Sequence, residues 1–179
     1  GRVDPEILEE ERALFETPNS ANPLLVDNAK SYDHLKVEII NKFNLPMPEQ
    51  ISEFKDLKLP QSLNDNIDRC GYQKLTIIQK NAIPIMNLRN NIMASSQTGS
   101  GKTASFLLPI IQNLLESGPP KNDVSKEEFK KTRKCFPLAI VMAPTRELAI
   151  QIHEEARKFC HLTGVLPKVI YGGKEAYNQ

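Results

Sequence analysis

The sequence has no tryptophan, and aromatic residues make up only 6% of its 179 residues. Its apolar runs, such as 106–111 and 137–143, are far shorter than the roughly 20 residues that a membrane-spanning helix needs. Three cysteines, Cys70, Cys135 and Cys160, form no Cys-x-x-Cys pair. These absences exclude a membrane bundle, a disulfide framework and a cysteine zinc site, and they predict ordinary thiols in a reducing compartment.

The amino terminus also lacks a signal: it is acidic and has neither the basic region nor the long apolar stretch of a secretory leader. It begins with Gly1 rather than Met, so we expect the start of the protein to be missing. The composition, 40% hydrophobic and 25% charged, is that of a folded protein and excludes collagen and a wholly disordered tail.

A net charge of +1 suggests little attraction for nucleic acid, but the charge is unevenly distributed. Residues 1–50 hold 5 Lys and Arg against 10 Asp and Glu, whereas residues 51–179 hold 18 against 12. We therefore expect an acidic, partly irregular arm over 1–50, which lies on a domain or hangs free. A domain over 51–179 carries net +6, which is compatible with RNA.

Within 51–179, apolar runs and helical patterns alternate. Helices are predicted after Pro60 as far as Gly71, over 77–86, from the glycine-rich run to about Ser117, and over 146–160. Pro84 is expected to kink or end the second of these. Strands are predicted at 91–95, 138–142 and 167–171, and a polar surface insertion over 118–134. This alternation predicts parallel βαβ units and a three-layer α/β fold.

The strongest chemical signal lies between a predicted strand and a predicted helix. It comprises Ser96, Gln97, Thr98, Gly99, Ser100, Gly101, Lys102 and Thr103. Glycines let backbone N–H groups line one concavity, and the helix amino terminus favours phosphate oxygens there. We expect Lys102 to reach the β- and γ-phosphates and the Thr103 hydroxyl to ligate Mg²⁺. Ser96 stands where the general phosphate-loop pattern has Gly, and a residue this small should leave the loop intact.

The identity of the base is predicted from Phe54 and Gln79. A Gln amide matches the N6 donor and N7 acceptor of adenine, and an aromatic ring can cover the face of the base. Taken alone, Gln79 is more typical of a solvated helix residue, and Phe54 of a core residue.

In their order, these motifs resemble those of DEAD-box RNA helicases, over about residues 31–179. The resemblance comprises a Q motif at 52–80, motif I at 96–103, motif Ia at 144–149 and a GG element at 172–173. The run Ile140–Ala149 followed by 155–159, with Tyr32-Asp33 and Val37-Glu38, is similar to the Vasa-like subfamily. The resemblance implies an incomplete RecA-like P-loop NTPase domain, with a parallel sheet flanked by helices.

The resemblance also implies roles for individual residues. Phe54 and Gln79 would hold adenine, supported by Tyr72 and Thr76. Leu75 stands where the family usually has Pro, which should loosen the backbone before Thr76. The residues implied in contact with the RNA backbone are Pro144, Thr145, Arg146, Gly172 and Gly173. Pro144–Arg146 is also compatible with a plain strand-to-helix turn in which Thr145 is the cap.

The 179 residues contain no Asp-Glu-Ala-Asp. We therefore expect the amino-terminal portion of a cytoplasmic ATP-dependent RNA helicase, with ATP, Mg²⁺ and RNA, single-stranded and duplex, as its ligands. By itself it should not hydrolyse ATP. Two alternatives stay open: a non-catalytic nucleotide- or RNA-binding module, and another P-loop ATPase such as a DNA translocase. Ribonucleoprotein granules and the nucleus stay open as locations, and protein partners are not identified.

Overall fold

The computed structural model describes residues 5–16, 36–119 and 136–173. Its helical elements, in chain order, are α1 (Pro5–Phe15), the 3₁₀ helix η1 (Phe54–Leu57), α3 (Gln61–Arg69), α4 (Ile77–Asn87), α5 (Lys102–Ser117) and α7 (Arg146–Cys160). Cys135 and nearly all of the expected insertion at 118–134 lie outside the described residues, as do 17–35 of the expected arm.

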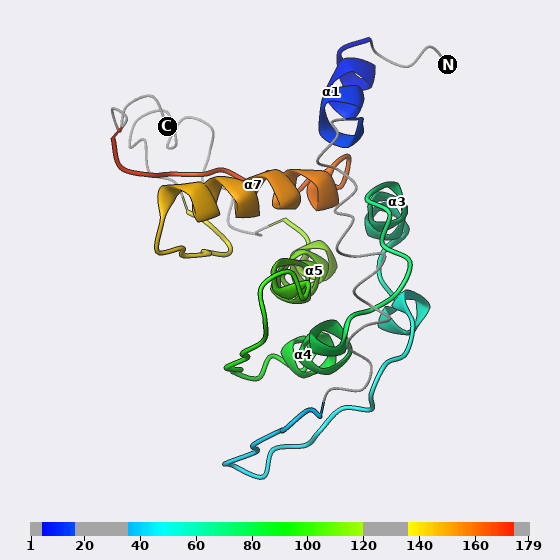
Figure 1. Ribbon diagram of the computed structural model, residues 1–179. Helices are drawn as coiled ribbons and strands as arrows, with labels where there is room; N and C mark the ends of the chain where they lie inside the picture. Colours follow the sequence, from blue (N-terminus) through cyan, green and yellow to red (C-terminus); the bar gives the residue numbers. More distant parts are fainter. Residues whose placement is uncertain (1–4, 17–35, 120–135, 174–179) are drawn as a thin grey trace.

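Helix α5 lies at the centre of the described part of the chain, between α4 and α7 (Figure 1). It is apolar along most of its length, and Leu107, Leu108 and Ile111 are buried. Helix α3 packs on α7, and the two are fastened by the buried side chain of Asn66. Its Nδ2 donates to the carbonyl oxygens of Phe159 at 2.9 Å and His161 at 2.7 Å. The core is therefore formed by helix-to-helix contacts.

The predicted helices are confirmed, with bounds close to the expected ones. Gly71 follows the end of α3 with a φ of +77°, in the left-handed region that glycine adopts without strain. Of the two effects expected of Pro84, it does not end the helix: α4 continues for three residues beyond it, and the expected kink stays a prediction. Pro84 is buried, and its neighbours Ala82 and Ile83 are buried as well, so packing along α5 offsets the lost backbone hydrogen bond.

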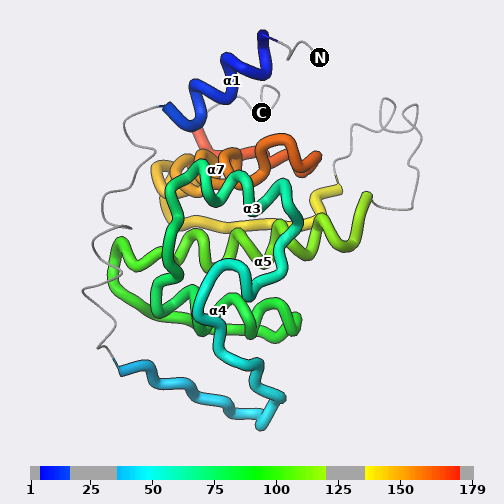
Figure 2. Tube along the Cα trace, turned by 90° about the vertical axis from the view of Figure 1, so that its right-hand side faces the viewer, coloured from blue at the N-terminus to red at the C-terminus, as the bar shows by residue number. Residues whose placement is uncertain are grey.

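The predicted strands are not observed: no residue in the described ranges belongs to a strand. The segment at 136–145 runs as a nearly straight trace beside α5 and α7 (Figure 2). Its Met142 is 88% exposed, Met93 of the first predicted strand is 99% exposed, and Ile170 of the third is 77% exposed. A strand needs a hydrogen-bonded neighbour about 4.8 Å away, and no such pairing is observed for these segments within the described ranges. The apolar pattern of the three segments is present without an observed sheet.

Helix α1, from the expected arm, lies against the carboxyl-terminal half of α7. Two residues of α1 make the apolar contacts. Leu14 is buried, and the Phe15 ring meets the His161 ring edge to face at a centroid distance of 5.6 Å. Two ion pairs flank these apolar contacts, Glu10–Arg157 at 3.1 Å and Glu11–Arg69 at 2.7 Å. This helix therefore lies on the domain rather than free of it.

Candidate nucleotide and RNA site

The phosphate loop of 96–103 leads directly into α5, whose first residue is Lys102. Gly99 and Gly101 have φ values of +79° and +85°, which side chains rarely adopt, and these two residues curl the loop. The hydroxyl of Ser96 lies 2.5 Å from that of Ser100, so the residue that departs from the general pattern closes the loop with a hydrogen bond. Ser96 is therefore compatible with the loop.

Lys102 folds back over this loop. Its Nζ donates to the carbonyl oxygens of Ser96 at 2.6 Å and Gln97 at 2.5 Å. A cation held by carbonyl groups only, at the amino terminus of a 16-residue helix, attracts an anion. Thr103, the next residue of α5, is half-buried in its first turn. The loop, the Lys102 ammonium and the Thr103 hydroxyl fit a nucleoside triphosphate with Mg²⁺. Lys102 would hold phosphate oxygens, and Thr103 would be a ligand of the metal.

Gln79 connects the Q motif to this loop. Its side chain is fully buried, its Oε1 accepts from the Thr76 N–H at 2.9 Å, and its Nε2 donates to the Gly101 carbonyl oxygen at 3.2 Å. A Cβ on Gly101 would lie only 2.5 Å from Nε2, so this close approach requires glycine. The structure thus places Gln79 against the phosphate loop, and its contact with adenine stays a prediction.

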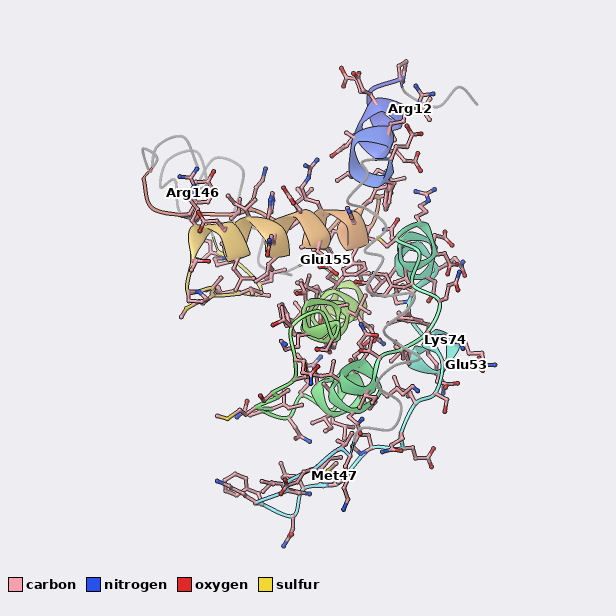
Figure 3. The ribbon with its side chains drawn as sticks, viewed as in Figure 1. Arg12, Met47, Glu53, Lys74, Arg146 and Glu155 are labelled. Carbon is pink, nitrogen blue, oxygen red and sulfur yellow. The ribbon has the colours of Figure 1, made fainter. Side chains whose placement is uncertain are left out.

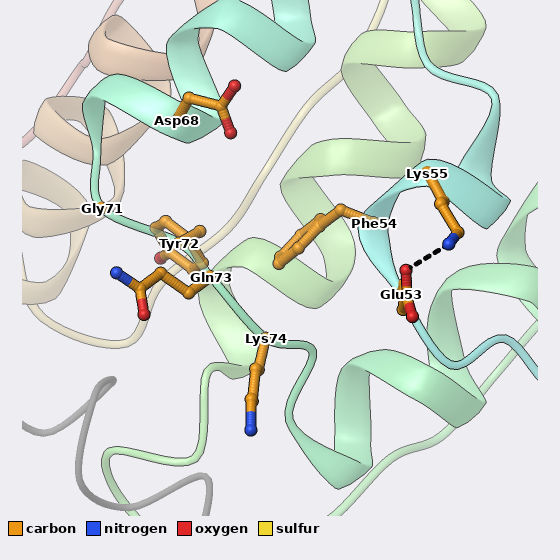
Figure 4. A pocket seen from close by; sticks show the side chains of 8 residues that line it. All are labelled: Glu53, Phe54, Lys55, Asp68, Gly71, Tyr72, Gln73 and Lys74. Carbon is orange, nitrogen blue, oxygen red and sulfur yellow. Dashed lines mark ion pairs between the residues drawn. The ribbon is translucent and has the colours of Figure 1, made fainter.

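The predicted adenine wall is aromatic and polar at its rim. Phe54 of η1 meets Tyr72 edge to face, with ring centroids 6.0 Å apart at 86°. Both rings border a cavity of about 580 Å³ (Figure 4). Its lining residues are Glu53, Phe54, Lys55, Asp68, Gly71, Tyr72, Gln73 and Lys74. A flat base has rings to pack on here and polar side chains for its edges.

Leu75, the departure from the family pattern, is buried in the core. It fills space between the helices, and Thr76 beside it still donates its N–H to Gln79. The expected loosening of the backbone before Thr76 is therefore opposed by core packing.

Sequence reasoning missed the residue that holds Phe54 in place. Asp56 accepts the backbone N–H groups of Ser52 and Glu53, both at 2.9 Å, and these hydrogen bonds hold the pKa of its carboxyl below the usual value. The signal was an acidic residue at the third position of η1. Gln73 and Lys74 at the cavity were missed too, because nothing in their spacing points to a site.

The predicted RNA-contacting residues meet at the amino end of α7. Thr145 is the N-cap, and its Oγ1 accepts from the Leu148 N–H at 3.3 Å. The guanidinium of Arg146 lies 4.5 Å from the centroid of the Tyr171 ring (Figure 3). This cation–π contact brings the 144–146 segment next to Gly172 and Gly173, all of them exposed. The cap confirms that 144–146 is the turn at the start of α7, and the contact of these residues with RNA stays a prediction.

The remaining titratable groups add no further chemistry. Burial raises the pKa of the Cys70 and Cys160 thiols to about 12, so both are ordinary unreactive cysteines. Across the described ranges, no cluster of His, Cys, Asp and Glu could hold a metal ion. A helix long and apolar enough to cross a membrane is likewise absent from these ranges.

The glycine-curled loop ahead of α5, its lysine and the buried Gln79 amide against it are features of the P-loop class of nucleotide-binding proteins, whereas the aromatic cavity is lined by neither Gln79 nor the loop. Residues 76–179 match the family described as DEAD/DEAH box helicase. The chain therefore belongs to the DEAD/DEAH box helicase family, and a RecA-like helicase fold follows from its solved relatives.

Three solved structures show this similarity. The RNA helicase Prp28 from Chaetomium thermophilum, bound to ADP, is 37% identical, with a TM-score of 0.62 over 74% of this chain and 30% of its own. A DEAD box protein from Methanococcus jannaschii is 32% identical, with a TM-score of 0.55 over 73% and 31%. Dbp5 from S. cerevisiae, bound to Gle1 and IP6, is 29% identical, with a TM-score of 0.52 over 70% and 30%. The chain thus spans under a third of these proteins.

Proposed function

We propose that this chain supplies the ATP-binding site and part of the RNA-backbone surface of an ATP-dependent RNA helicase of the Vasa-like subfamily. The observation that carries the proposal is the Gln79 bridge. One buried amide contacts Thr76 and the phosphate loop at Gly101, which supports the proposal that the segments for base and phosphate form one site.

In this proposal, Phe54 packs on adenine, and Lys102 exchanges two loop carbonyls for phosphate oxygens. When bound, Mg²⁺ neutralises phosphate charge, and Thr103 offers it a hydroxyl ligand. The 179 residues hold no Asp-Glu-Ala-Asp, so we propose that the chain binds ATP without hydrolysing it.

The RNA part of the proposal rests on the exposed turn at 144–146 and the neighbouring Gly172 and Gly173. A hydroxyl, a guanidinium and bare backbone are groups that contact phosphates and sugars, which gives binding without base specificity. We propose that closure on ATP bends a single strand here and opens short duplexes locally, in the cytoplasm.

Titration of the chain with a fluorescent ATP analogue tests the nucleotide site. We expect Mg²⁺-dependent binding that Lys102→Ala lowers at least tenfold, because a phosphate then loses its cation. The matched control is Lys42→Ala, an exposed lysine outside both segments. Equal binding by Lys102→Ala and the control would refute the site.

Competition with GTP tests the base. We expect ATP to be preferred, and Gln79→Ala to reduce that preference along with the affinity. Adenine selectivity that survives Gln79→Ala would favour a different P-loop ATPase, one that does not use this residue. RNA-stimulated ATP hydrolysis by the complete gene product tests the helicase assignment, and hydrolysis indifferent to RNA would contradict it.

A further inference from the structure

Tyr72 makes a contact that the nucleotide site does not require. Its hydroxyl donates a hydrogen bond to Oε1 of Glu155 at 2.5 Å, across 83 residues of sequence. Tyr72 lines the cavity beside Phe54, where we propose that adenine binds, whereas Glu155 belongs to α7, the helix that begins at the proposed RNA-contacting turn. One hydrogen bond thus connects the two halves of the proposed site.

Ring contacts run alongside this hydrogen bond. The Tyr72 ring lies 6.0 Å from Phe54 on one side and 5.6 Å from Phe159 on the other, between ring centroids. Phe159 is fully buried and lies one helical turn beyond Glu155, so both face the Q motif from the same side of α7. The Tyr72 ring therefore lies between Phe54 and the Phe159 ring of α7.

Position 155 disfavours a charged carboxylate. Burial raises the pKa of Glu155, and the Tyr72 hydrogen bond and nearby Lys158 only partly oppose that effect. Glu155 is half-buried, and an apolar side chain would pack there without the cost of partly removing a charge from water. The neighbouring Glu154 is exposed, so α7 already carries a solvated carboxylate beside the half-buried one of Glu155. The hydrogen bond itself, with its defined direction, is the feature that an apolar residue would not supply.

We propose that Glu155 is a positioning residue that, through the Tyr72 hydroxyl, fixes the aromatic wall of the nucleotide cavity relative to α7 and so couples base binding to RNA binding. The inference rests on the proposed function, since it needs both ligands. By linkage, nucleotide then strengthens RNA binding by the same factor by which RNA strengthens nucleotide binding. For this coupling, the residue at position 155 must offer an oxygen that accepts from the Tyr72 hydroxyl, and it does not need a negative charge.

The test measures this factor in the complete gene product. The Kd of a fluorescent ATP analogue is determined with and without a saturating single-stranded RNA, and the ratio of the two is the coupling factor. We expect a ratio in the usual range of about 5 to 150 for the natural sequence. Glu155→Ala and Tyr72→Phe should bring it close to 1, while Glu155→Gln, which keeps an acceptor oxygen, should retain most of it. Glu154→Ala is the matched control and should change nothing.

Loss of packing alone would weaken both affinities and leave the ratio unchanged. Tyr72→Phe keeps the ring and removes only the hydroxyl, so it remains informative if Glu155→Ala fails to fold. Natural protein that binds both ligands, with a ratio that Tyr72→Phe leaves intact, overturns this inference while the proposed function stands. Natural protein that binds neither ligand overturns the proposed function and the inference with it.

Discussion

Gln79 shows how one side chain organises two segments. Its amide is buried between the Thr76 N–H, for which it supplies the acceptor, and the Gly101 carbonyl, which also accepts from the Ser105 N–H at 3.1 Å. A buried donor or acceptor left without a partner costs roughly 1–3 kcal/mol. Gln79 therefore contributes to the folded state as well as to the proposed site.

We expect Gln79→Ala to lower the free energy of unfolding by about 2 kcal/mol without nucleotide, because the Thr76 N–H loses its acceptor. Chemical denaturation of the ligand-free chain measures this change. Gln73→Ala, an exposed glutamine of the same motif, should stay within about 0.5 kcal/mol of the natural sequence. Equal stability of the two variants would show that Gln79 acts on ligand alone.

Glu155 makes stability depend on pH. Its pKa is raised in the folded state, mainly by burial, so over the window between the usual and the raised value the folded state binds more protons than the unfolded one. The contribution of Glu155 to the free energy of unfolding is complete below the usual glutamate pKa. It declines as the pH rises through the raised pKa of the folded state. We expect the stability of Glu155→Gln relative to the natural sequence to increase with pH across that window.

Denaturation at a series of pH values measures the difference, with Glu154→Gln as the control. Taking differences matters because other carboxyls act oppositely: hydrogen bonds lower the pKa of Asp56. A difference between Glu155→Gln and the natural sequence that does not change with pH would contradict the prediction.

At the scale of elements, the helices were predictable because their signals are local. A 3.6-residue apolar pattern, Gly71 after α3 and Thr145 before α7 are read from neighbouring residues. The strands at 91–95, 138–142 and 167–171 depend on partners elsewhere, and their apolar residues lie exposed where no partner is described. The Gln79–Gly101 and Tyr72–Glu155 contacts were beyond prediction for the same reason, since only the fold brings those residues together.

Thr145 serves the start of α7 and the proposed RNA contact, and substitutions separate the two. We expect Thr145→Ala to cost about 1 kcal/mol of stability through the lost cap. Thr145→Asp should keep the cap, because aspartate is a good N-cap residue, yet reduce RNA affinity through repulsion of phosphate. Thr145→Ser should preserve both. Thermal melting and a filter-binding assay with single-stranded RNA measure the two effects, and unchanged RNA affinity in Thr145→Asp would argue against the contact.

Across the whole molecule, the acidic helix α1 meets basic residues of the domain, which makes the near-neutral total charge a sum of two complementary parts. Glu10–Arg157 and Glu11–Arg69 join them, and the Arg69 guanidinium lies 5.9 Å from the centroid of the Phe15 ring. These pairs are partly exposed, and such pairs contribute about 0.2–1 kcal/mol each. Full burial of a leucine contributes about 1.5–3 kcal/mol, so apolar contact outweighs charge in holding α1.

The contribution of Leu14 provides the test of that ranking. Leu14 of α1 is 6% exposed, whereas Leu8 of the same helix is 43% exposed. We expect Leu14→Ala to speed amide hydrogen exchange over residues 5–15 at least tenfold, because about 2 kcal/mol of burial is lost from the docked helix. Leu8→Ala makes the same substitution at an exposed position of the helix and should have little effect on the exchange rate. The double variant Glu10→Gln, Glu11→Gln should raise the rate by an intermediate amount, and added salt should reproduce that increase in the natural sequence. Faster exchange in the double glutamine variant than in Leu14→Ala would instead assign the attachment of α1 to charge, and then 0.5 M salt alone would release the helix.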